Sequence, residues 1–281
     1  MFFCNLFWFL NTRSIFRLLL MKALLFFIVL FSVTGFAQGS FTLEPVEQFP
    51  LKANRFIGVD HLGSYYSVSN NTLFKKAGTE VFQYKDFQLG VPGAVDLLNP
   101  LKITLFYPAY QTAVILDNKL NEIKRISFAM KPPFLNIKNA TTANDNRLWV
   151  FNEDSQQLEL YNFRDQINKV LSRPISETYQ GQLSDYNYCY VFTETQLRLY
   201  NIYGSLLRRI SLENIEKSSL SGERLMVLSD KQLNLFSQQL EQKDAVKTPE
   251  ITIKDLFLSG EFLYIYDGEI IHKMKLIKSQ N

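Results

Sequence analysis

Few residues of this chain have the types and neighbours that catalysis or soft-metal binding requires. The chain contains two histidines, His61 and His272, and two cysteines, Cys4 and Cys189. Neither histidine has a recognisable set of partner residues, so we interpret both as structural. Cys189 lies in an apolar run, which is typical of an inert core thiol. Because CxxC, HExxH, GxSxG, phosphate-cradle and Asp-rich calcium motifs are all missing from the sequence, no motif identifies an enzyme.

Two proline-containing segments carry aromatic residues that could instead contact a partner. Residues 107–111 read Tyr-Pro-Ala-Tyr-Gln and residues 131–134 read Lys-Pro-Pro-Phe. Rigid aromatic side chains on loops often supply contact area in protein interfaces. Tyr107, Tyr110 and Phe134 are therefore the candidate binding residues. The alternative is that they cover the adjacent strands.

The composition is that of a folded protein with a neutral body. Of 281 residues, 47% are hydrophobic and 20% are charged, which excludes a disordered chain. The formal net charge of +3 comes from residues 1–37, which contain Arg13, Arg17 and Lys22 and no acidic residue. Because the remaining basic and acidic residues balance, we expect no nucleic-acid partner.

Residues 1–37 form an apolar leader. Met21 and Lys22 precede the apolar run 23–34, and Gly35 and Ala37 follow it. This pattern predicts a signal peptide cleaved after Ala37, with residues 1–20 as a mis-assigned upstream extension. The alternative is an uncleaved membrane anchor over residues 15–37. Both alternatives place residues 38–281 outside the cytoplasm, in the periplasm or cell envelope, with membrane contact only through an uncleaved leader.

Related segments recur along residues 38–281 at intervals of about 40 residues. Their first residues are 70, 112, 157, 196, 232 and 268. Each follows a second alternating apolar run, and most have a further strand-like run on either side, which indicates strands. Four strands per repeat predict an all-β fold, a six-bladed β-propeller of four-stranded blades. A large β-sandwich is the alternative, but it would not require this period. The run 41–47 is expected to close the last blade, which lacks an outer strand of its own.

Residues 59–66, 220–225 and 258–264 each place a glycine-containing turn between two strands. In this they resemble the six-bladed propellers of the NHL and TolB-like type. Together with the leader, the pattern is similar to exported Bacteroidota propellers of unassigned function. Some six-bladed propellers of this superfamily are hydrolases that hold Ca²⁺ in a central channel. The resemblance would place these oxygen-bearing side chains in such a channel: Asp60, Asp96, Asn139, Asp185 and Asp255.

These channel residues have two interpretations. They could hold a cation, or they could solvate the channel wall and cap turns. Their offsets from the following strands are uneven, which favours the second interpretation. We therefore expect a non-catalytic binding or scaffold propeller, with a protein or envelope component as partner and with neither cofactor nor metal. The alternative is a channel-centred, divalent-cation-dependent hydrolase or lyase.

Overall fold

The computed structural model describes residues 40–130 and 134–279. The predicted leader, residues 1–37, lies outside this part of the chain. The described residues form 24 β-strands and one short 3₁₀ helix, η1 (Pro108–Tyr110). None of their helices is long and apolar enough to cross a membrane. The prediction of an all-β chain built from repeated four-stranded sheets is confirmed.

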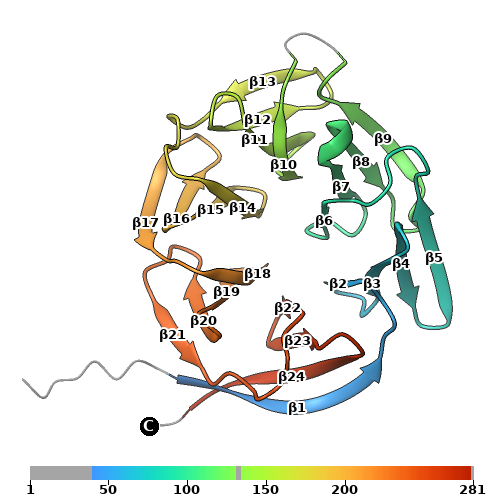
Figure 1. The fold of residues 1–281 in the computed structure, drawn as a ribbon, viewed down its shortest axis with the longest axis vertical. Coiled ribbons are helices and arrows are strands. Elements are labelled where there is room, and N and C mark those ends of the chain that lie inside the picture. The colour runs from blue at the N-terminus through green and yellow to red at the C-terminus, as the bar shows by residue number, and fades with distance from the viewer. Residues whose placement is uncertain (1–39, 131–133, 280–281) are drawn as a thin grey trace, which may run out of the picture. The chain divides into compact units, whose positions relative to one another are not determined.

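Four sheets each contain four consecutive strands (Figure 1). The first contains β2 (Arg55–Val59), β3 (Tyr65–Ser69), β4 (Thr72–Ala77) and β5 (Glu80–Lys85). The second contains β6 (Ala94–Asp96), β7 (Ile103–Tyr107), β8 (Thr112–Leu116) and β9 (Glu122–Ser127). The third contains β10 (Ile137–Thr142), β11 (Arg147–Asn152), β12 (Gln157–Asn162) and β13 (Ile167–Val170). The fourth contains β14 (Tyr179–Ser184), β15 (Tyr188–Thr193), β16 (Gln196–Asn201) and β17 (Leu206–Ser211).

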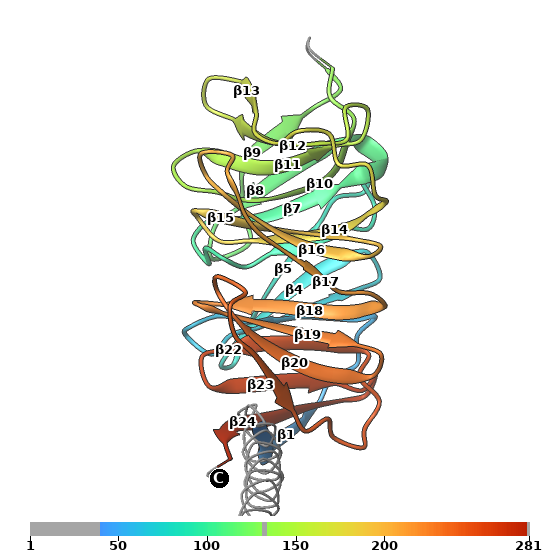
Figure 2. The same ribbon diagram turned by 90° about the vertical axis from the view of Figure 1, so that its left-hand side faces the viewer.

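The remaining strands form one eight-stranded sheet made of two groups of four. Its order is β18-β19-β20-β21-β1-β24-β23-β22. The first group contains β18 (Ile215–Ser221), β19 (Arg224–Ser229), β20 (Gln232–Ser237) and β21 (Lys243–Val246). The second contains β1 (Ser40–Pro50), β24 (Ile270–Lys278), β23 (Phe262–Tyr266) and β22 (Asp255–Ser259). Figure 2 shows the sheets following one another along one side of these residues.

Tight hairpins join many of these strands, and local sequence explains their geometry. In the β3–β4 turn, Asn70 and Asn71 have φ angles of 48° and 63°, and in the β19–β20 turn, Asp230 and Lys231 have 49° and 60°. Two consecutive residues of positive φ form the turn type whose twist matches paired strands. Asn and Asp tolerate this region better than most residues because their short side chains hydrogen-bond locally.

The hydrophobic core lies between neighbouring sheets. Tyr66 and Leu73 of the first sheet share one cluster with Ile103 and Leu105 of the second. Trp149 of the third sheet is fully buried in a cluster shared with the fourth. Each middle strand therefore packs on both of its faces, which explains why β7 and β8 are buried along their whole length.

The first described strand pairs with the last. β1 runs antiparallel to β24, from Phe41 opposite Lys278 to Pro50 opposite Ile270, with a bulge between Pro45 and Glu47. Its first two residues also pair in parallel with β21. β1 thus supplies the fourth strand of the group that contains β22, β23 and β24.

The group made of β22, β23, β24 and β1 also contacts the first sheet. The backbone N–H of Phe56 on β2 donates a hydrogen bond of 3.0 Å to Asp255 Oδ2 on β22. Nearby, Gly58 lies against Phe257, and a Cβ at position 58 would lie 2.4 Å from that ring. Glycine is required here because no larger residue allows the two strands to approach so closely.

The pairing of β1 with β24 can be tested by removing one apolar contact. Leu43 packs partly buried against the core shared by β20, β23 and β24. We expect Leu43→Ala to lower the free energy of unfolding by about 1–3 kcal/mol, because it removes buried apolar area and leaves a cavity. Urea denaturation measures this change. Glu44→Ala, at the next and exposed position, is the control and should change stability by less than about 0.5 kcal/mol. Equal effects of the two variants would contradict a stabilising role for this pairing.

Candidate functional site: the central cavity and the loop aromatics

A cavity of about 750 Å³ lies between the first strands of the successive sheets. Side chains and backbone of β2, β6, β10, β14, β18 and β22 line it. All five residues that the resemblance placed in a channel are among the lining residues: Asp60, Asp96, Asn139, Asp185 and Asp255.

Asp60 is held by its own sheet. Its carboxylate accepts hydrogen bonds of 2.9 Å from Tyr66 Oη and from the backbone N–H groups of Leu62 and Ser64. Lys75 Nζ lies 3.4 Å from Oδ2, and both side chains are almost completely buried. Burial works to raise the pKa of Asp60, but the bonds from Ser64 and Tyr66 and the Lys75 charge outweigh it and lower the pKa. This carboxylate is a buried, fully engaged ion.

Asp96 bridges two sheets. At the end of β6, it accepts a hydrogen bond of 2.6 Å from the backbone N–H of Thr142 on β10. Its other oxygen accepts one of 2.9 Å from Leu98 N–H. Burial raises the pKa of Asp96, and these hydrogen bonds only partly oppose the shift. Raised pKa values often mark functional acids, yet here one oxygen bonds to the neighbouring sheet and the other to the connection that follows β6.

Asp185 and Asp255 make similar bridges. Asp185 accepts 2.7 Å hydrogen bonds from the backbone N–H groups of Asn187 and Tyr188, and Gln238 of the next sheet donates to its second oxygen. Besides Phe56 N–H, Asp255 binds Lys217 Nζ at 3.1 Å. In residues 40–130 and 134–279, no group of three or more metal-ligating side chains converges. In the described geometry, the carboxylates of Asp96, Asp185 and Asp255 each contact a group of a neighbouring sheet.

The histidines and the cysteine lie apart from one another. His61 is in the bend after β2 and lines the cavity. His272 on β24 has Nε2 2.7 Å from Asp267 Oδ2. Burial works to raise the pKa of Asp267, but this contact and the bonds from backbone N–H groups lower that pKa to about 2. Cys189 is completely buried, and burial raises the pKa of its thiol, which keeps it protonated.

The predicted aromatic candidates separate into core and surface residues. Tyr107 is the last residue of β7, and only 1% of its surface is exposed, so it packs against the adjacent strands, as the alternative interpretation expects. All five residues of β7, including the polar Thr104, are buried, so alternation gave no sign of where exposure begins. Tyr110 in η1 and Phe134 after β9 are 53% and 67% exposed.

Hydrogen bonds hold the segment that carries Tyr110 in place. Gln111 adopts a left-handed conformation with φ of 48°. Its side chain donates to the carbonyl oxygens of Pro108 and Ile137 and accepts from Ile137 N–H. Its own carbonyl accepts from Phe128 N–H. Tyr110 therefore lies on a connection that is hydrogen-bonded to both ends of the β9–β10 connection.

Three further apolar residues lie on the neighbouring connections. Phe87 is 87% exposed, and Val91 and Met130 are exposed as well. Gly93, which ends the Phe87 connection, lies directly against Pro108, so that the connections adjoin. We call the following set the loop surface: Phe87, Val91, Tyr110, Met130 and Phe134. The signal for two of the missed members, Phe87 and Val91, was the long β5–β6 connection Asp-Phe-Gln-Leu-Gly-Val-Pro-Gly, whose proline and glycines indicate a loop with apolar residues.

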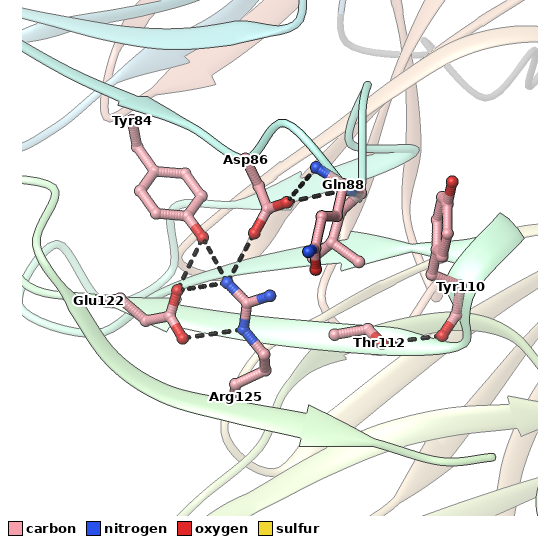
Figure 3. Close-up of polar contacts among 8 residues, drawn as sticks. Tyr84, Asp86, Gln88, Tyr110, Thr112, Glu122 and Arg125 are labelled. Atoms are coloured by element: carbon pink, nitrogen blue, oxygen red, sulfur yellow. Dashed lines mark hydrogen bonds and ion pairs between the residues drawn. The ribbon is translucent and has the colours of Figure 1, made fainter. Parts of the chain in front are cut away.

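An ionic network fixes the base of the Phe87 connection (Figure 3). Arg125 on β9 lies 2.6 Å from Asp86 and 2.7 Å from Glu122, and Tyr84 on β5 donates to Glu122 at 2.8 Å. Asp86 also accepts hydrogen bonds from the N–H groups of two residues that follow Phe87. Burial opposes the shift, but these bonds lower the pKa of Asp86, so it stays charged. The network joins the first and second sheets beside the loop surface.

Comparison with known proteins shows the fold and no closer relationship. No family model and no curated protein matches the sequence. Among solved structures, the WD40 repeats of RRP9 align over 83% of this chain and 99% of theirs, at 8% identity and a TM-score of 0.55. BamB from Moraxella catarrhalis aligns over 85% of this chain and 99% of its own, at 9% identity and a TM-score of 0.50. A catalytically inactive virginiamycin B lyase from Staphylococcus aureus with quinupristin aligns over 87% of this chain and 97% of its own, at 9% identity and a TM-score of 0.54. These similarities show a β-propeller fold.

The bridging role of the cavity acids can be tested at Asp255. We expect Asp255→Ala to lower the free energy of unfolding by about 1–3 kcal/mol, because Phe56 N–H and Lys217 lose their shared acceptor. Asp255→Asn keeps one oxygen acceptor and should lose less. Chemical denaturation compares both with Glu80→Ala, an exposed control on β5. If Asp255→Ala is as stable as this control, the carboxylate does not hold the two sheets together.

Proposed function

We propose that this chain is a six-bladed β-propeller that acts as a non-catalytic protein-binding scaffold outside the cytoplasm. The single observation that carries the proposal is the loop surface. Five large apolar side chains are exposed on adjoining connections whose backbones are held by Gln111 and Arg125. Exposed apolar groups on a rigid support cost little conformational entropy on binding, which is typical of interaction sites.

The six-blade assignment is supported by the strand pairing. Four sheets have four strands, and the eight-stranded sheet divides at the short β1–β21 contact into two further groups of four. The first and last groups meet through Asp255 and Phe257. A ring of six four-stranded blades accounts for all of these contacts.

The proposed location outside the cytoplasm rests on the leader sequence. The apolar run 23–34 followed by Gly35, Phe36 and Ala37 has the pattern of an export signal. The free thiol of Cys189 is compatible with an oxidising compartment, because its complete burial protects it. A protein or envelope component is accordingly the proposed partner.

A photo-crosslinking experiment tests the loop surface. We expect a photoreactive phenylalanine analogue at position 87 or 134 to give a discrete covalent adduct with another protein in intact cells, because these side chains would be covered by the partner. The same analogue at Val81 is the control, since it is similarly exposed but lies on β5. Mass spectrometry identifies the adducts. Adducts of equal yield from all three positions, or none, would contradict a specific surface.

A cation titration separates this proposal from the cation-dependent hydrolase or lyase. We expect no stoichiometric heat on calorimetric titration of the protein with Ca²⁺ or Zn²⁺, because the cavity carboxylates already bind N–H groups and lysines. A site with a Kd below about 100 µM that disappears in the Asp96→Asn variant would favour the enzyme instead.

A further inference from the structure

The outer strands β13 and β17 belong to neighbouring sheets and each has one unpaired edge. Among the described strands, β13 pairs only with β12, and β17 pairs only with β16 (Figure 1). The two sheets touch beside these strands, because Gly204 before β17 lies against the carbonyl of Leu171, the residue after β13. An open edge presents backbone groups that can pair with another chain.

Exposed apolar residues flank this contact. Val170 and Tyr203 are the chain neighbours of the two touching residues, and both are exposed. On β17, a bulge opposite Tyr200 interrupts the pairing, and the consecutive side chains of Leu206 and Leu207 are both exposed. In a regular strand, consecutive side chains would face opposite sides. We call Val170, Tyr203, Leu206, Leu207 and Arg209, two residues further along β17, the outer patch.

The outer patch has an excess of positive charge. Arg209 lies directly opposite Arg198 on β16, and like charges in this position repel. Only 8% of Arg198 is exposed, and its guanidinium pairs with Glu177. Its Nε is buried without a hydrogen-bond partner. Within the described part of the chain, neither Arg209 nor Lys169 of β13 pairs with a carboxylate. Of the two opposed arginines, only Arg198 therefore has a carboxylate partner in the described part of the chain, and an incoming acidic group at Arg209 would relieve the repulsion.

We propose that the outer patch binds an extended acidic segment of a partner protein, which adds a strand to the open edge of β17. Leucine side chains of the patch would receive the apolar residues of that segment, and Arg209 its carboxylates. This mode of recognition combines backbone hydrogen bonds with side-chain selectivity. The site is separate from the loop surface, so a negative result here leaves the function proposed above untouched.

The strand register identifies the backbone groups available for pairing. Leu212 N–H donates to the carbonyl of Thr195, whereas Gln196 N–H donates to the Thr193 hydroxyl and not to Ser211. Because antiparallel pairing alternates, the backbone groups of Ser211 and Arg209 point to the open edge. Ser211→Pro removes one of these N–H groups without changing charge, and an edge strand tolerates proline at such a position.

The experiment measures fluorescence anisotropy of a labelled peptide of alternating Glu and Leu with the full-length protein. We expect saturable binding that Ser211→Pro and Arg209→Glu each weaken at least tenfold. Arg209→Glu should not lower the melting temperature, since it places opposite charges across β16 and β17. Lys124→Glu, the same charge change on the outer strand β9, is the control and should leave binding unchanged.

Four results would overturn the proposal. These are a lack of binding to the Glu–Leu peptide, equal binding of its Lys–Leu counterpart, equal binding by both patch variants, and an equal loss in Lys124→Glu. Phosphatidylglycerol vesicles provide the second arm. If Arg209→Glu weakens vesicle binding while Ser211→Pro does not, and neither variant affects peptide binding, the patch recognises an anionic membrane surface instead.

Discussion

The pairing between β1 and β24 is the contact that joins the two ends of the described chain. Four of the sheets are built from consecutive strands, so they can form from local hairpins. The group that contains β22 needs a strand from more than 200 residues earlier in the chain, and closing so long a loop has a large entropic cost. The contacts of Asp255 with Phe56 and of Phe257 with Gly58 join β22 to β2 in the same region. These contacts and the β1–β24 pairing together join the start of the described chain to its end.

The convergence of the sheets on the cavity explains why its acids form contacts between sheets. The first strands converge on the cavity, where polar groups cannot be covered by a neighbouring core. Buried backbone N–H groups still need acceptors. Asp96 and Asp255 supply acceptors across sheet boundaries, and Asp60 neutralises the buried Lys75. A carboxylate used in this way has fewer free lone pairs for a cation or a substrate. Exposed side chains that make few contacts within the fold lie instead on the connections and the outer strands.

Much of the strand pattern could be predicted from sequence, because each repeat brings its own local signal. The segments beginning at Gln157, Gln196 and Gln232 are β12, β16 and β20. Side-chain exposure was harder to predict. Tyr107 belongs to a strand buried on both faces, where period-two alternation disappears. Phe87 was missed because its exposure depends on a connection fixed by Arg125, a residue of another sheet. Likewise, the sequence shows that a first strand carries an acid. It does not show which N–H group donates a hydrogen bond to that acid, or which sheet carries the donor.

The two proposed surfaces differ in the energetic cost that each places on the folded state. The loop surface exposes Phe87 and Phe134 to water, yet its polar supports are satisfied by the Arg125 network and Gln111. The outer patch instead retains an unfavourable interaction, since Arg198 and Arg209 oppose each other and, among the described residues, only Arg198 pairs with a carboxylate. A glutamate at position 209 would remove this repulsion. Local conflicts of this kind are expected where a sequence is shaped by binding as well as folding. The arginine pair is therefore stronger evidence for a charged partner than exposure alone.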